Sequence, residues 1–229
     1  MSRLVTLAIL ATLLCGGNAA IAQDASKLGP QPAEIEQEGY SSGDAARKTM
    51  YAFAACVLKR HRKHVTELLA LPVDDSTITR DMQPLADENC LAEGSLQFEP
   101  LLFRGSLYVE LYRVEFGTKA AQLNPTPVSV NAIPSSSPNP NLQSFSTLFG
   151  FADCLTHRDP WSVRTIVLAG PGSRQENEGL TTLSPEFQLC LVKGTQMRLS
   201  KSMLTGLLAE ALYRQSRTPS PDVTAGVAR

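Results

Sequence analysis

Residues 53–60 read FAACVLKR, and residues 151–158 read FADCLTHR. Phe, Ala, Cys and Arg recur at the same spacing, 98 positions later. Working outward, further blocks match in the same order: 90–91 with 190–191, Gly105 with Gly206, and 111–113 with 212–214. The offset drifts only from 98 to 101 across these blocks. Agreement of this kind predicts an internal duplication.

Within each copy, residues that typically begin or end a helix recur at short intervals, which predicts short helices. Asp159 followed by Pro160 places a capping carboxylate before a proline at the first helical position. The helix expected at 160–169 has a broad apolar face that carries Trp161, Val163, Ile166 and Val167. Glu99 with Pro100, and Ser200 in the second copy, open the longest apolar helix of each unit. Ser184 and Pro185 are expected to start a separate short helix that carries Cys190. The predicted fold class is all-α, with two tandem homologous units of four to five short helices each and one disulfide per unit.

Composition divides the chain further. Segments rich in Pro, Gly, Ser, Asn and Gln lack apolar periodicity, so they are expected outside the helical units. The predicted organisation is a signal peptide at 1–22, a disordered arm at 23–43, repeat unit 1 at 44–116, a linker at 117–143, repeat unit 2 at 144–215 and a disordered tail at 216–229.

The first residues have the parts of a secretory signal. An apolar run at 4–14 follows a short basic start, and small residues precede a predicted cleavage between Ala22 and Gln23. The run is too short to span a bilayer as a helix, which needs about 20 apolar residues. Lipid attachment at Cys15 is disfavoured because the bulky Leu14 precedes it. The expected location is therefore the periplasm or the exterior, with no transmembrane anchor in the mature chain.

The charge balance gives no reason to expect nucleic acid as a partner. The formal net charge of the 229 residues is −1 at pH 7, so the chain lacks the excess of basic residues that nucleic-acid binding requires.

Four cysteines remain after the predicted cleavage: Cys56, Cys90, Cys154 and Cys190. An even number in an exported protein predicts disulfides, and four cysteines permit three pairings. If the units are duplicates, the simplest pairing joins the two cysteines inside each unit. A zinc site and a redox-active cysteine pair are both disfavoured because no Cys-x-x-Cys is present.

The first unit contains a run of six basic or titratable residues, for which there are two interpretations. It could bind an anion or a partner protein, or it could be the solvated end of a helix whose dipole basic residues satisfy. The second unit has no equivalent run. A metal site built on its two histidines is disfavoured because no carboxylate or cysteine accompanies them at a convincing spacing. The run comprises Lys59, Arg60, His61, Arg62, Lys63 and His64.

Paired arginines accompany the repeated blocks. Arg60 and Arg158 each follow a cysteine by four residues, which puts them on the same helix face as the cysteine. Arg113 and Arg214 end the repeated Leu-Tyr-Arg. A structural role in bonding carbonyls or carboxylates is favoured over ligand binding. No catalytic residue, metal site or cofactor is predicted, since hydrolase, metalloprotease and phosphate-loop motifs are absent from the sequence.

The pattern FxxC-x3-R, CL-x2-G and LYR resembles uncharacterised exported proteins of alphaproteobacteria, in which such a helical segment often occurs twice. The resemblance covers 51–113 and 149–214. It implies an exported compartment and a repeat, and it brings no activity and no catalytic residues. The first copy departs from the pattern, because LYVELYR at 107–113 stands where the second copy has LAEALYR at 208–214.

Together these features predict an exported, disulfide-stabilised helical protein with a non-catalytic binding or structural role in the cell envelope. Its expected partner is an envelope protein or an anionic envelope component. The alternative is an enzyme with its site in the cleft between the two units. An enzyme should show a pocket with converging polar side chains, whereas a docking module should show an exposed apolar patch.

Overall fold

The computed structural model describes residues 34–36, 42–71, 82–85, 87–91, 99–119, 140–191 and 197–217. Helices dominate this part of the chain, and the predicted all-α class is confirmed. The only strands within it are two short segments that pair in parallel. The elements are β1 (Glu34–Glu36), α1 (Ser42–Ala70), η1 (Gln83–Leu85), η2 (Glu88–Cys90), α3 (Pro100–Phe116), α4 (Pro140–Arg158), α5 (Pro160–Leu168), α6 (Arg174–Cys190), β2 (Arg198–Ser200) and α7 (Lys201–Arg217).

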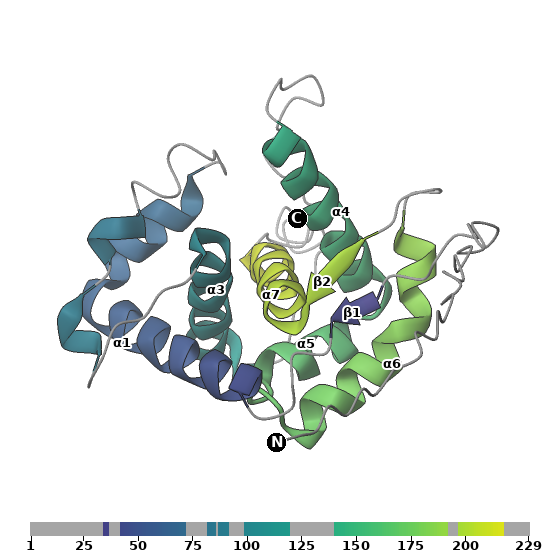
Figure 1. Ribbon diagram of the computed structural model, residues 1–229, viewed down its shortest axis with the longest axis horizontal. Helices are drawn as coiled ribbons and strands as arrows, with labels where there is room; N and C mark the ends of the chain where they lie inside the picture. Colours follow the sequence, from purple (N-terminus) through teal and green to yellow (C-terminus); the bar gives the residue numbers. More distant parts are fainter. Residues whose placement is uncertain are drawn as a thin grey trace, which may run out of the picture.

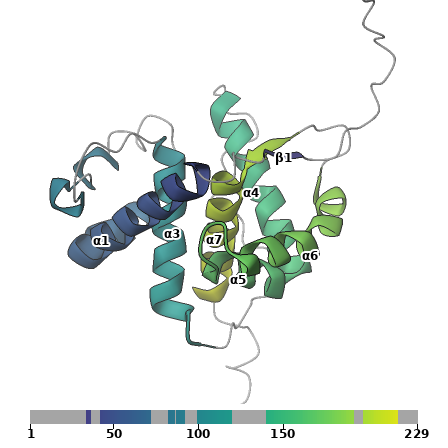
Figure 2. The ribbon, with the colours of Figure 1, turned by 60° about the horizontal axis from the view of Figure 1, so that its bottom comes forward.

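Two helices form the centre of the molecule. α3 and α7 lie side by side, with α1 against α3 on one side and α4, α5 and α6 on the α7 side (Figure 1). The turned view keeps α3 and α7 adjacent and shows α1 crossing α3 (Figure 2). The core is made from the apolar faces that meet at this centre. Its fully buried members include Val57, Val65, Phe103, Leu107, Leu111, Leu155, Ile166, Leu204, Leu208 and Leu212.

The closest approach of the two central helices occurs at a pair of glycines. A Cβ built on Gly105 would lie 2.7 Å from the Cα atom of Gly206, and one built on Gly206 would lie 2.8 Å from that of Gly105. Real Cβ atoms essentially never come so near to another backbone. The two helices are therefore packed backbone against backbone, which requires glycine at both positions.

The residue that follows each repeated Arg interrupts a helix. His61, after Arg60, has non-helical backbone angles (φ −126°, ψ 31°) inside α1. Asp159, after Arg158, separates α4 from α5 and accepts a hydrogen bond from the backbone N–H of Ser162. The two copies thus bend at matching places. The duplication itself stays a prediction.

Two details of the helix predictions are wrong. α6 runs without interruption through Pro185, which was expected to start a new helix. Pro185 removes the donor for the carbonyl of Thr181, but the hydroxyl of Ser184 donates to that carbonyl at 2.9 Å. Trp161 was assigned to the apolar face of its helix, yet it is 66% exposed while Val163 on the same helix is buried.

Segment boundaries also differ from those expected. β1 lies within the predicted disordered arm, where Glu34 stands opposite Arg198 in the strand register. α4 begins inside the predicted linker, and α7 ends two residues inside the predicted tail. The predicted signal peptide and its cleavage site lie outside the described residues, as do most of the arm, linker and tail. Among the helices that the structure describes, none has the length and apolar character to cross a membrane.

Both disulfides join the cysteines as the repeat predicted. Cys56 pairs with Cys90, and Cys154 pairs with Cys190, with a Cα–Cα distance of 5.6 Å in each bridge. Each bridge ties a long helix, α1 or α4, to the last residue of a second element, Cys90 of η2 or Cys190 of α6.

Replacing both cysteines of either bridge by alanine is expected to lower the free energy of unfolding by roughly 3–4 kcal/mol, because each bridge closes a loop in the unfolded chain. The sequence separations are similar, 34 and 36 residues, so the two losses should be similar. Urea denaturation followed by far-UV circular dichroism measures both. A loss below about 1 kcal/mol for either variant would contradict the expectation.

Candidate functional site

The arginines that follow the first cysteine of each pair bind carboxylates near the second cysteine. Arg60 donates to Asp87 at 2.6 Å, three residues before Cys90. Arg158 donates to Glu186, four residues before Cys190. Each ion pair therefore lies beside a disulfide and joins the same two segments that the disulfide joins.

Most side chains of the basic run in the first unit contact carboxylates of the same chain. The ring of His61 lies 2.9 Å from Asp87, which also binds Arg60. Arg62 donates to Glu115 on α3 at 3.0 Å. In addition, the ammonium of Lys63 lies 3.9 Å from Glu67. The remaining two members, Lys59 and His64, are exposed on α1. Most of the run therefore has partners within the protein.

Arginines on α3 and α5 each bind the carboxyl end of the other helix. Arg113 donates to the carbonyls of Val167 and Ala169 at the end of α5. Arg164 of α5 donates to the hydroxyl of Tyr112 at 2.8 Å. It also donates to the carbonyls that follow α3, those of Phe116, Gly117 and Lys119. The guanidinium of Arg164 therefore links α5 to the end of α3.

A buried ionic cluster joins α3 to α7. Arg104 donates to the two carboxylate oxygens of Glu210, at 2.9 and 3.3 Å. Arg214, one turn further along α7, donates to one of the same oxygens at 2.7 Å. The hydroxyl of Tyr108 accepts from both arginines, at 3.2 and 3.3 Å, and donates to the carbonyl of Leu69 on α1 at 2.7 Å. We refer to Arg104, Tyr108, Glu210 and Arg214 as the buried cluster.

Within the buried cluster, the carboxylate of Glu210 lies between the guanidinium groups of Arg104 and Arg214. Burial alone raises the pKa of Glu210, but the charges and hydrogen bonds of Arg104 and Arg214 outweigh burial and hold that pKa below its ordinary value. Glu210 is therefore ionised at neutral pH, and it faces two guanidinium groups. Burial, with a smaller contribution from the charge of Glu210, raises the pKa of Tyr108, so its hydroxyl keeps its proton.

A pocket opens beside the buried cluster, between α1, α3 and α7. Its volume is about 560 Å³, within the range of small-molecule sites. Arg214 and Arg217 supply two guanidinium groups to its wall. Glu67, the carboxylate among its lining residues, is 61% exposed and lies beside Lys63. The other lining residues are Thr66, Leu69, Ala70, Tyr108, Leu111 and Tyr213. We call this cavity the α1–α7 pocket.

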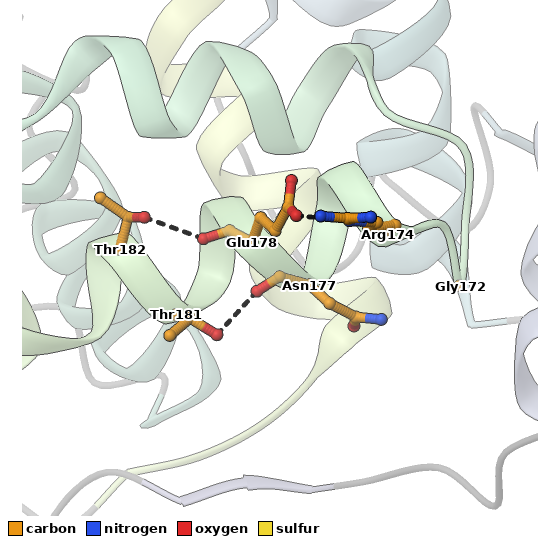
Figure 3. A pocket seen from close by; sticks show the side chains of 6 residues that line it. All are labelled: Gly172, Arg174, Asn177, Glu178, Thr181 and Thr182. Atoms are coloured by element: carbon orange, nitrogen blue, oxygen red, sulfur yellow. Dashed lines mark hydrogen bonds and ion pairs between the residues drawn. The ribbon is translucent and has the colours of Figure 1, made fainter.

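A second hollow lies on the outer face of α6 (Figure 3). It has a volume of about 500 Å³ and is lined by Gly172 and by polar side chains of α6. The hydroxyls of Thr181 and Thr182 donate to carbonyls of their own helix. Arg174 and Glu178 pair with each other at 2.6 Å. These two charges pair with each other, whereas the lining of the α1–α7 pocket includes two arginines, Arg214 and Arg217.

Within the residues that the structure describes, no group of three or more His, Cys, Asp or Glu side chains is placed to hold a metal ion.

Comparison with known proteins identifies no relative. The chain matches no family model, no curated protein and no solved structure.

Sequence reasoning missed most of the residues at the centre of the molecule. Arg214 was identified as a structural arginine, but Arg104, Glu210 and Arg217 were not identified. One signal was available: Arg104 and Glu210 are charged residues within otherwise apolar helical stretches, where a charge needs a buried partner. A second buried ion pair was missed in the same way, that of Arg47 on α1 with Glu176 on α6.

Proposed function

We propose that this protein is exported and that it binds an anionic ligand in the α1–α7 pocket without transforming it. The two arginines that line this pocket, Arg214 and Arg217, carry the proposal. Guanidinium groups make strong charge-assisted hydrogen bonds to anions, so an anion at the pocket wall would be stabilised by both side chains. The two disulfides support export, because such bridges persist in oxidising compartments.

The polar groups of the pocket favour binding over catalysis. A guanidinium keeps its proton at all ordinary pH values, and Tyr108 keeps its hydroxyl proton because burial raises its pKa. Tyr213 likewise has a raised pKa through burial. General acid–base catalysis is most effective with a pKa near the working pH. These groups are suited to donating hydrogen bonds to an anion.

Arg217→Gln tests the proposal, because Arg217 reaches the pocket from the last turn of α7 and its guanidinium donates to Tyr213 at 2.9 Å. The probe is 8-anilinonaphthalene-1-sulfonate, an aromatic anion whose fluorescence rises on binding. We expect one saturable site in the wild type and an affinity about tenfold lower in the variant, since a charge-assisted hydrogen bond contributes about 1.5 kcal/mol.

Arg174→Gln is the matched control, because Arg174 lines the hollow on α6 and is exposed. Its affinity for the probe should equal that of the wild type. Equal affinities in all three proteins would place the anion elsewhere and would contradict the proposal. The probe should also be recovered unchanged after long incubation, whereas a chemically altered probe would favour an enzyme.

A further inference from the structure

A chain of polar contacts connects the basic run to the α1–α7 pocket. Arg62, a member of the run on α1, donates to one carboxylate oxygen of Glu115 on α3 at 3.0 Å. The hydroxyl of Tyr213 on α7 donates to the other oxygen of Glu115 at 3.1 Å. The same hydroxyl accepts from the guanidinium of Arg217 at 2.9 Å. Tyr213 and Arg217 line the pocket, so the chain ends at the pocket wall.

The negative charge of Glu115 acts on the guanidinium of Arg217. The hydrogen bond with Tyr213 raises the pKa of Arg217, and the charge of Glu115 adds to this rise. The side chain of Glu115 is 19% exposed, so water and salt screen its charge less than they would on an open surface. Glu115 therefore stabilises the positive charge of Arg217 without belonging to the pocket lining.

An anion bound in the pocket would have to share Arg217 with Glu115. Two negative charges near one guanidinium repel each other, so Glu115 lowers the affinity of the pocket for an anion. Arg62 has the opposite effect, because its guanidinium pairs with Glu115 and offsets the charge of that carboxylate. Arg62 and Glu115 thus change anion binding in opposite directions.

We infer that Arg62 and Glu115 set the affinity of the α1–α7 pocket for its anion. Glu115 is an internal competitor for Arg217, and Arg62 is the residue that neutralises this competitor. Both are positioning residues that act through the hydroxyl of Tyr213. The basic run thereby gains a member with a function. This inference rests on the proposed function and adds the residues that regulate the same site.

Glu115→Gln tests the competitor, because the amide keeps the shape of the side chain and can still accept from Tyr213. Fluorescence titration with 8-anilinonaphthalene-1-sulfonate gives the dissociation constant. We expect the variant to bind this probe about fivefold tighter than the wild type, the upper range for an ion pair near the surface. A merely structural role of Glu115 would have the opposite sign, because a displaced Tyr213 would lower the affinity.

Arg62→Gln tests the neutralising residue. It should weaken probe binding about threefold, because Glu115 then acts on Arg217 without an offsetting charge. In the Glu115→Gln background the same substitution should leave the affinity unchanged. The side chain of Arg62 is 53% exposed, so this variant serves even if Glu115→Gln fails to fold. Lys59→Gln is the matched control, since it removes one charge from an exposed residue of the same run, and its affinity should equal that of the wild type.

The outcomes distinguish the inference from the proposed function. If the wild type has one saturable site and Glu115→Gln binds no more tightly, Glu115 is not a competitor and the inference is wrong, while the anion site remains. If Arg62→Gln lowers the affinity equally in both backgrounds, Arg62 does not act through Glu115, and the inference is again wrong. If the wild type has no saturable site, both the inference and the proposed function fail.

Discussion

Replacing Gly105 by alanine is expected to destabilise the protein by about 3 kcal/mol, although alanine is the better helix former. The new methyl group would lie 2.7 Å from the Cα atom of Gly206, and backbone cannot move aside as a flexible side chain can. α3 and α7 would have to separate, and the core between them would open. Urea denaturation monitored by far-UV circular dichroism gives the free energy of unfolding.

Gly150→Ala is the matched control, because it makes the same substitution in a helix where the added methyl group meets nothing within 4 Å. Gly150 is exposed on α4, so this variant should be more stable than the wild type by about 0.5–1 kcal/mol. The two substitutions should thus differ in sign. A stabilising Gly105→Ala would show that α3 and α7 do not pack backbone against backbone.

Replacing Glu210 by glutamine is expected to lower the free energy of unfolding by about 3–5 kcal/mol. The amide is nearly isosteric, but it leaves Arg104 and Arg214 beside each other with no negative charge between them. The side chains of Arg104 and Glu210 are each only 3% exposed, so water cannot take over the lost interaction. The measurement is again the free energy of unfolding in urea.

Glu178→Gln provides the comparison for a carboxylate in an exposed ion pair. The side chains of Arg174 and Glu178 are 88% and 58% exposed, and such pairs contribute at most about 1 kcal/mol. If Glu210→Gln were no more destabilising than Glu178→Gln, the carboxylate of Glu210 would not be what holds Arg104 and Arg214 in the buried cluster.

Features that depend on residues close together in the sequence were predictable. The Asp159–Pro160 start signal defines the beginning of α5, where Asp159 accepts the capping hydrogen bond. The disulfide pairing followed from the repeat, because each copy carries two cysteines at matching positions. Pro185 shows the limit of such signals, since a neighbouring hydroxyl lets the helix continue through the proline.

Features that depend on contacts across the chain were not predictable. Arg104 and Glu210 are separated by 106 positions, and helical periodicity does not say which charged residue faces which. The α1–α7 pocket is lined by residues of α1, α3 and α7, which lie far apart in the sequence, so only the packing of these helices shows it.

The most direct test of ligand binding in the α1–α7 pocket is the Nε–Hε nuclear magnetic resonance spectrum of the arginine side chains during titration with 8-anilinonaphthalene-1-sulfonate. Arg214 and Arg217 line the pocket, whereas Arg174 lies on the outer face of α6. We expect the resonances of Arg214 and Arg217 to shift and saturate together, while the resonance of Arg174 stays in place. Resonances of Arg214 and Arg217 that remain unchanged at a saturating concentration of this probe would contradict an anion-binding pocket at this site.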